Sequence, residues 1–179
     1  MWVDLFIGAV LLFIIVMGAV LVGQLFIAVP WVPTPRKVVR TVLREMDLRP
    51  GQVFYDLGAG DARSLIEAKK MQPELRLIGC EIAPAVFAWG KLRLLLSGTR
   101  ADFHFRSAFT TDLHDADALF LYLFPGMLGK LVPKFDAELR PGTRVVSVVF
   151  PIPSRTPVRE IPLDFWKKGR RAFVYEWGG

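Results

Sequence analysis

A glycine turn between an extended apolar run and an amphipathic run constrains this chain more than any other feature. Residues 55–63 read Tyr-Asp-Leu-Gly-Ala-Gly-Asp-Ala-Arg and follow Val53-Phe54 directly. Gly58 and Gly60 permit positive φ values and let a ligand approach the backbone closely. In a strand–turn–helix junction of this kind, backbone N–H groups at the helix start face an anionic or polar ligand. The segment predicts an α/β fold with a ligand site at this turn; an ordinary tight turn is the alternative.

The spacing of the turn indicates which cofactor it suits. A dinucleotide fingerprint, G-x-G-x-x-G, would need glycine where Arg63 stands. The better fit is the Asp-x-Gly-x-Gly loop by which class I methyltransferases hold S-adenosylmethionine, with Asp56 as its acid. Glu81 ends the next apolar run, where an acidic side chain can accept hydrogen bonds from both hydroxyls of a ribose. A lone glutamate after a strand is usually a solvated residue at a sheet edge, but together with the glycine turn Glu81 favours an adenosine cofactor.

Apolar extended runs and amphipathic runs alternate along the rest of the chain. Strands are expected at 53–57, 75–81, 101–105, 117–123 and 143–150, and helices at 62–71, 84–97 and 127–138. Such alternation is typical of a parallel sheet with helices on both faces. The runs 158–163 and 172–177 resemble a terminal pair of strands, and 106–115 is too short for a full crossover helix. We expect a compact Rossmann-like α/β fold of the class I methyltransferase type.

The first 29 residues are almost uniformly apolar. No charged residue lies between Leu5 and Gly23, and at about 1.5 Å per residue this run can cross a hydrocarbon core of roughly 30 Å. A signal peptide needs a basic region before its apolar run, where only Asp4 is charged. We therefore expect a single transmembrane anchor at residues 1–29, with the lipid bilayer as a partner. Because basic residues follow the anchor and none precedes it, the positive-inside bias predicts a cytoplasmic catalytic domain.

Residues 30–51 are expected to form a proline elbow and a helix that Thr34 can cap. The apolar face of that helix consists of Val38, Val39, Val42, Leu43 and Met46. Residues 52–179 then form the cofactor-binding domain, which is long enough for one hydrophobic core.

The charges and the cysteine content exclude several other functions. The formal net charge is +6, with basic clusters at 36–49 and 167–171. Beside an apolar anchor such clusters favour anionic lipid headgroups, so nucleic acid is not the expected partner. Cys80 is the only cysteine, and His104 and His114 are not spaced as a metal pair. We predict no disulfide and no metal site.

Two further groups of residues extend the predicted cofactor site. Ser107, Ala108 and Phe109 follow the third expected strand, where an adenine ring would rest. Phe109 can stack on that ring or belong to the core. Asp61 and Arg63 follow the glycine turn and either contact the methionine end of the cofactor or pair with each other or with the first helix.

Four segments occur together in an order typical of one enzyme family. They are Val32-Pro33-Thr34-Pro35, the loop Asp56 to Arg63, Gly79-Cys80-Glu81 and Val149-Phe150-Pro151-Ile152-Pro153. With the apolar segment before them, they resemble the small membrane-anchored lysine methyltransferases that modify the ATP synthase c-subunit and the adenine nucleotide translocase in mitochondria, and their prokaryotic relatives. The resemblance covers nearly the whole chain. It implies a class I fold, S-adenosylmethionine as cofactor and a lysine of a membrane-associated protein as acceptor.

The resemblance also implies roles for particular residues. Thr34 and Pro35 would close over the cofactor, and residues 150–153 would line the acceptor side. With the residues named above, the predicted cofactor-binding set is Thr34, Pro35, Asp56, Gly58, Ala59, Gly60, Asp61, Arg63, Glu81, Ile82, Ser107, Ala108 and Phe109. The predicted acceptor side comprises Phe124, Phe150, Pro151 and Pro153.

The chain departs from this family at two places. Ala62 stands where the family usually has the last glycine of Gly-Asp-Gly-Arg, and Ser154 and Arg155 stand where an aromatic residue often occurs. The first departure bears on cofactor binding, and the second bears on the identity of the acceptor.

The catalytic chemistry has no obvious base in this sequence. Direct displacement requires a neutral amine aligned behind the methyl group. Tyr122 can orient that amine or be a core residue. The Asn/Asp-Pro-Pro-aromatic tetrapeptide of nucleic-acid amino methyltransferases is absent, because the fourth strand ends Leu-Tyr-Leu-Phe-Pro at 121–125. Two other functions stay open: methylation of a lipid, quinone or other small membrane-associated acceptor, and a non-catalytic membrane module with the same fold.

Overall fold

The computed structural model describes residues 2–26 and 32–178, with side chains for residues 2–18 and 32–178. The helices are α1 (Trp2–Phe26), α2 (Arg36–Glu45), α3 (Arg63–Met71), α4 (Pro84–Leu96) and α5 (Pro125–Glu138). The strands are β1 (Val53–Leu57), β2 (Arg76–Glu81), β3 (Asp102–Phe105), β4 (Ala118–Leu121), β5 (Arg144–Val148), β6 (Arg159–Pro162) and β7 (Arg171–Glu176). A short 3-10 helix spans Ala108–Thr110.

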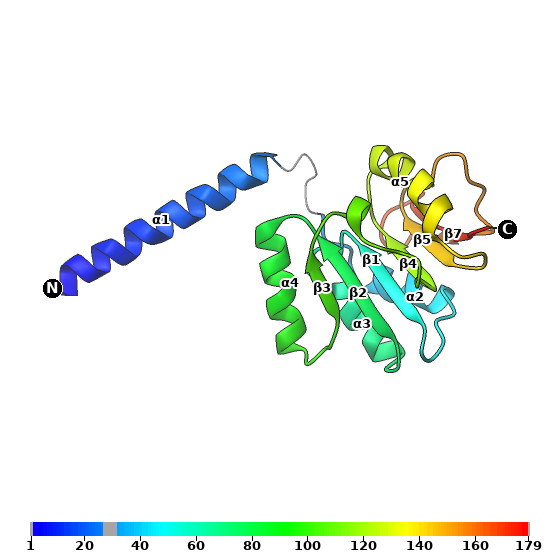
Figure 1. The fold of residues 1–179 in the computed structure, drawn as a ribbon, viewed down its shortest axis with the longest axis horizontal. Coiled ribbons are helices and arrows are strands. Elements are labelled where there is room, and N and C mark those ends of the chain that lie inside the picture. Colours follow the sequence, from blue (N-terminus) through cyan, green and yellow to red (C-terminus); the bar gives the residue numbers. More distant parts are fainter. Residues whose placement is uncertain (1, 27–31, 179) are drawn as a thin grey trace.

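The strands form one sheet in the order β3-β2-β1-β4-β5-β7-β6 (Figure 1). The first five strands in this order are parallel, and β7 runs antiparallel to both of its neighbours. The chain order reverses between β1 and β4, and ligands of open α/β sheets bind outside the carboxyl ends of the strands at such a point. The predicted terminal strand pair is present as β6 and β7, and the Rossmann-like α/β fold is confirmed.

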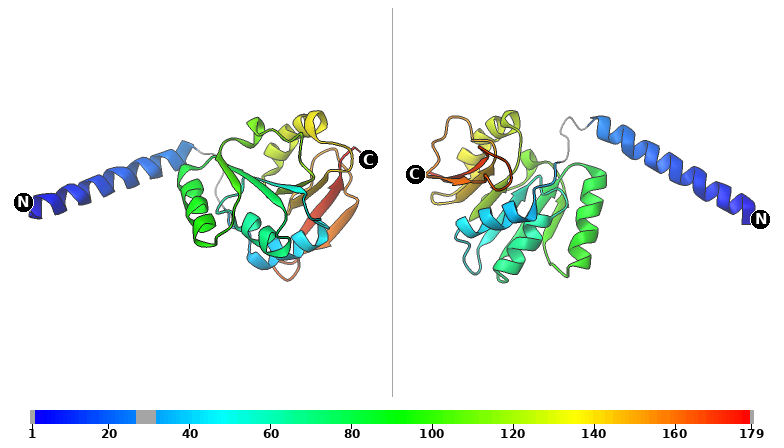
Figure 2. Two further views of the ribbon diagram at one scale, coloured as in Figure 1. Left: turned by 60° about the horizontal axis from the view of Figure 1, so that its bottom comes forward. Right: turned by 180° about the vertical axis from the view of Figure 1, so that it is seen from behind.

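Helices cover the two faces of the sheet unequally (Figure 2). Buried side chains of α2, α3 and α4 pack with Phe54 and Phe120 on one face. On the other face, α5 and the connection after β3 pack with Tyr55 and Leu57. Because successive side chains of a strand point to opposite faces, β1 contributes to both cores. The connection after β3 contains only one 3-10 turn, as its length predicted.

Helix α2 packs its apolar side chains into the first core. The five apolar residues predicted for its buried face are 2% exposed or less. The predicted cap is wrong, because Pro35 occupies the N-cap position and no side chain caps the helix. Thr34 lies one residue too early to cap the first turn; it is buried, and its carbonyl accepts a hydrogen bond from Arg63 instead.

Helix α1 lies outside the sheet-and-helix domain (Figure 1), and its described apolar side chains are exposed. Crossing a bilayer takes about 20 consecutive apolar residues, and among the side chains that the structure describes no helix reaches the necessary length and hydropathy. On this finding, the prediction of a single-pass membrane protein anchored by residues 1–29, with a cytoplasmic catalytic domain, is wrong. Residues 27–31, part of that prediction, lie outside the described residues.

Helix α4 approaches the glycine turn without an intervening side chain. A Cβ atom added at Gly90 would lie 2.9 Å from the carbonyl oxygen of Gly60 and 2.7 Å from the ring of Phe103. Real Cβ atoms essentially never come so close to backbone atoms. Glycine at position 90 therefore allows α4 to lie against both β3 and the turn.

Candidate active site

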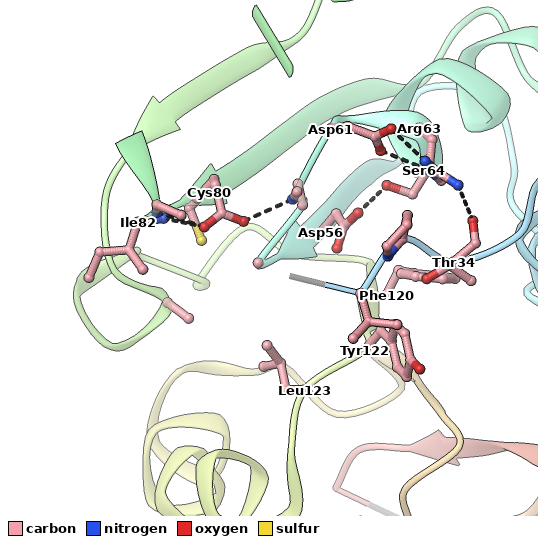
Figure 3. Close-up of a pocket in the computed structure, with 18 of the residues that line it drawn as sticks. Thr34, Asp56, Asp61, Arg63, Ser64, Cys80, Ile82, Phe120, Tyr122 and Leu123 are labelled. Carbon is pink, nitrogen blue, oxygen red and sulfur yellow. Dashed lines mark hydrogen bonds and ion pairs between the residues drawn. The ribbon is translucent and has the colours of Figure 1, made fainter. Parts of the chain in front are cut away.

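A cavity of about 430 Å³ opens where β1, β2 and β4 end. This volume is typical of a small-molecule site. Its lining residues are Val32, Pro33, Thr34, Val39, Asp56, Gly58, Ala59, Gly60, Asp61, Arg63, Ser64, Cys80, Glu81, Ile82, Ala83, Arg106, Ser107, Ala108, Phe109, Phe120, Tyr122, Leu123 and Met127. Figure 3 shows Cys80 and Ile82 at one side of this cavity and Thr34 and Tyr122 at the other.

Backbone hydrogen bonds fix the glycine turn to β2. The N–H groups of Gly58 and Ala59 both donate to the carbonyl of Cys80, each at 2.9 Å. Gly58 has a φ of +79°, and a Cβ atom there would lie 2.9 Å from the side chain of Leu123. Glycine suits this left-handed conformation, and without a side chain the backbone at this position borders the cavity directly.

Backbone donors on two sides hold the carboxylate of Glu81. One oxygen accepts from the N–H of Gly60 at 3.0 Å, and the other accepts from Ile82 and Ala83, each at 2.8 Å. A carboxylate oxygen has room for about two hydrogen bonds. The oxygen bonded to Gly60 therefore keeps one acceptor position, and the three N–H groups fix where that position lies.

Asp56 is a buried acid at the end of β1. It is 4% exposed and accepts a hydrogen bond from the hydroxyl of Ser64 (Figure 3). Burial, with smaller contributions from the negative charges of Glu81 and Asp61, raises the pKa of Asp56 to about 7, and the Ser64 hydrogen bond opposes this rise. Near neutral pH this carboxyl can therefore gain or lose a proton.

Two arginines neutralise Asp61. Arg63 pairs with it through two hydrogen bonds of 2.8 and 2.6 Å, and Arg93 of α4 adds a third. Burial raises the pKa of Asp61, but the hydrogen bonds and charges of these arginines outweigh it and hold the pKa below its ordinary value. A remaining nitrogen of Arg63 donates to the carbonyl of Thr34. This network ties the segment before α2 to the glycine turn.

Comparison with known protein families shows to which enzyme family the chain belongs. The model of the ANTKMT methyltransferase domain matches residues 56–159. The chain belongs to the ANTKMT methyltransferase family. It is an S-adenosylmethionine-dependent methyltransferase, as predicted from the glycine turn and Glu81.

Individual relatives resemble this methyltransferase over most of its length. A protein-lysine N-methyltransferase of Saccharolobus islandicus (strain REY15A) is 32% identical over 149 residues, 82% of this chain and 92% of that protein. The adenine nucleotide translocase lysine N-methyltransferase of Mus musculus is 33% identical over 73% of this chain, which matches 57% of the mouse protein. A crystal structure described as an RNA methyltransferase from Salinibacter ruber with S-adenosyl-L-homocysteine superposes with a TM-score of 0.75, at 32% identity, over 81% of this chain and 93% of that one.

All but one of the predicted cofactor residues line the cavity of the methyltransferase. The exception is Pro35; from the same segment, Val32 and Pro33 line the cavity instead. Phe109 is 41% exposed and does not belong to the core. Asp61 and Arg63 form the predicted mutual ion pair, and a contact with the methionine end of the cofactor stays a prediction.

The predicted acceptor residues lie outside the residues that line the cavity. The rings of Phe124 and Phe150 pack against each other with centroids 5.8 Å apart. Pro151 and Pro153 are exposed, and the segment between them is held by a hydrogen bond from Ile152 N–H to the hydroxyl of Tyr175. The acceptor role of this segment stays a prediction.

Several lining residues were not predicted, and their signals differ. Ser64 directly follows Arg63 in the first turn of the helix after the glycine turn, a position that could have been read from the sequence. Arg106 directly follows β3 and could have been included with Ser107 for the same reason. Phe120 and Met127 carry no such signal, because apolar residues in a strand and a helix are usually core.

One group of described side chains has the composition of a metal site. Ligand atoms of Asp112, His114 and Glu138 lie within 4.8 Å of one another. The carboxylate of Glu138 already accepts from Lys134 and from the backbone N–H of Leu113. A cation at this position would compete with these donors, and the group lies apart from the cavity lining.

Proposed function

We propose that this enzyme transfers the methyl group of S-adenosylmethionine to the side-chain nitrogen of a lysine in a protein. The observation that carries the proposal is the 32% identity to a protein-lysine N-methyltransferase across 92% of that protein. Shorter matches to two histone-lysine N-methyltransferases, at 27% and 31% identity, agree with it.

The chemistry of the cavity suits the proposed cofactor. S-adenosylmethionine carries a sulfonium, an ammonium and two ribose hydroxyls. The free acceptor position of Glu81 suits a ribose hydroxyl, and the carboxylate of Asp56 suits the ammonium. Ile82 and Phe109, both partly exposed along the lining, provide apolar surface for an adenine ring. The absence of a side chain at Gly58 leaves room for the ligand beside the turn.

When bound, the cofactor supplies a methyl group on a good leaving group, so the protein mainly aligns the amine and excludes water. Val32, Pro33 and Thr34 line the cavity together with Tyr122. A lysine ammonium that enters this partly apolar space loses charge stabilisation, which lowers its pKa and favours the neutral nucleophile. The hydroxyl of Tyr122 is the predicted group that accepts a hydrogen bond from the amine and orients it.

Because the similar Salinibacter ruber protein is described as an RNA methyltransferase, RNA is the second candidate acceptor. One experiment separates the two. The full chain is incubated with methyl-labelled S-adenosylmethionine and, in parallel, with a lysine-rich protein, the same protein with its lysines acetylated, and total RNA. Label in the unmodified protein alone, with methyl-lysine found by mass spectrometry, supports the proposal. Label in RNA but not in the protein would overturn it.

A further inference from the structure

Basic side chains gather beside one end of the cavity. The connection between β6 and β7 contributes Lys167, Lys168 and Arg170, and the first turn of α2 contributes Arg36 and Lys37. These five residues are called the basic rim. Asp164 is the only acid between Leu163 and Arg171, and it accepts a hydrogen bond from Gly169 N–H. The rim therefore carries a local excess of positive charge.

Two cation–π contacts fix cations of the rim, and the first of them joins its two parts. The ammonium of Lys37 lies 4.6 Å from the ring centroid of Phe165, and the guanidinium of Arg170 lies 4.2 Å from that of Trp166. Such contacts hold a cation in place without neutralising its charge. By contrast, Arg171 pairs with Glu160 and is not counted in the rim.

Two of the remaining rim cations keep their charge available. Lys167 and Lys168 are exposed and form no ion pair among the side chains that the structure describes. Arg36 is also exposed, but part of its charge acts on the carboxylate of Glu67. Exposed cations raise the local concentration of anionic groups and steer their approach.

The rim borders the Tyr122 side of the cavity. The rings of Tyr122 and Trp166 meet edge to face with centroids 6.2 Å apart, and Tyr122 lines the cavity. Thr34, also in the lining, precedes Arg36 by two residues. Ile82 lies at the other side of the cavity (Figure 3). A chain that enters beside Tyr122 therefore passes over the rim.

We propose that the basic rim docks an acidic segment of the acceptor protein that flanks the methylated lysine. This inference rests on the proposed function and adds a preference in substrate sequence to it. A protein segment suits the rim better than single-stranded RNA, because RNA-binding surfaces offer aromatic faces on which bases stack. Here the faces of Phe165 and Trp166 carry the enzyme's own cations.

The test compares two peptides, each with one lysine, flanked by glutamates in one and by serines in the other. We expect the wild-type enzyme to have a KM about ten-fold lower for the glutamate peptide at low ionic strength, and a smaller preference at about 0.3 M salt. The double variant Lys167→Glu/Lys168→Glu should raise the KM of the glutamate peptide about ten-fold, with little change for the serine peptide or for kcat. The matched control Lys130→Glu/Arg100→Glu makes the same charge change at exposed positions outside the rim and should behave as wild type.

The possible outcomes distinguish a failure of the docking proposal from a failure of the proposed function. Equal KM values for the two peptides, or equal effects of the two double variants, would overturn the docking proposal while leaving lysine methylation intact. Binding of S-adenosylmethionine by calorimetry without methylation of either peptide would overturn the proposed function. Methylation of an RNA oligonucleotide that the rim variant abolishes would overturn the docking of a protein segment and assign the rim to nucleic acid.

Discussion

The hydroxyl of Ser64 donates a hydrogen bond to the carboxylate of Asp56, and both side chains are buried where β1 ends and α3 begins. Burial raises the pKa of the acid and the hydroxyl opposes that rise. This pair therefore makes the glycine turn sensitive to pH.

Replacement of Asp56 should change how stability depends on pH. Because the pKa of Asp56 rises from an ordinary 3.8 to about 7 on folding, the folded protein holds a proton between these values that the unfolded chain has released. The stabilisation from this group is full below about pH 4 and is lost as pH rises through 7. In Asp56→Asn the melting temperature, relative to wild type, should therefore rise between pH 5 and pH 8. A difference that does not change with pH would contradict the buried carboxyl.

Loss of the Ser64 hydroxyl should weaken cofactor binding near neutral pH. Ser64→Ala removes a hydrogen bond that favours the ionised form of Asp56, so its pKa should rise further. With a hydrogen bond worth about 1 kcal/mol, we expect calorimetry to show about five-fold weaker binding of S-adenosylmethionine at pH 7 and recovery at pH 9. Ser97→Ala, in an exposed position, is the control. A loss of affinity that is equal at both pH values would show that Ser64 does not act through ionisation.

Removal of the Arg63 guanidinium should detach the segment before α2. Arg63→Met deletes the donor to the Thr34 carbonyl, and Arg93 continues to neutralise Asp61. A hydrogen bond from a charged group is worth about 1.5–3 kcal/mol, so cofactor affinity should fall at least ten-fold and hydrogen exchange at residues 32–39 should accelerate. Arg93→Met keeps the Thr34 contact and serves as the control. If the two variants lose cofactor affinity to the same extent, the loss arises from the weaker neutralisation of Asp61 rather than from the Thr34 contact.

Restoring glycine at position 62 should change stability little. Ala62 has a φ of +59°, a conformation that costs an alanine about 1–2 kcal/mol relative to glycine. Its methyl group is fully buried, however, and losing it costs about 0.8 kcal/mol. Because these contributions nearly cancel, denaturant unfolding of Ala62→Gly should differ from wild type by less than about 1 kcal/mol. Ala68→Gly, equally buried within α3, should lose about 2 kcal/mol because the helical penalty adds to the lost burial. Equal losses in the two variants would disprove the conformational argument.

If Tyr122 has its predicted role, its hydroxyl affects kcat but not the affinity for the cofactor. Tyr122→Phe keeps the ring that meets Trp166 and deletes only the hydroxyl. If that hydroxyl orients the amine, kcat should fall about ten-fold, within the usual range for a positioned polar group, and calorimetry should show unchanged affinity for S-adenosylmethionine. An unchanged kcat would reassign Tyr122 to the core.

The residues that line the cavity at the glycine turn were more predictable than those from other elements, for a physical reason. Gly58 and Glu81 act through backbone conformation and a fixed distance from a strand end, and both follow from local sequence. Other lining residues, such as Phe120 and Met127, reach the cavity from separate elements. Their apolar character serves the core equally well, so only the tertiary structure distinguishes them.

Helix boundaries and the amino terminus show other limits of local reasoning. Threonine is a common N-cap residue, but here Pro35 occupies the N-cap position of α2. The carbonyl of Thr34 instead accepts a hydrogen bond from Arg63. The apolar run at the amino terminus predicted a helix, and α1 is one. Its predicted membrane-spanning role is wrong, because among the described side chains no helix has the length and hydropathy needed to cross a membrane.

The missing side chain at Gly90 has a consequence for protein engineering. Helix α4 and the glycine turn share one steric constraint although thirty residues of sequence separate Gly60 from Gly90. A graft of the turn onto another scaffold would fail against a helix that carries even an alanine at this place. The turn and α4 are therefore one transferable unit, and a designer who wants this pocket must move both.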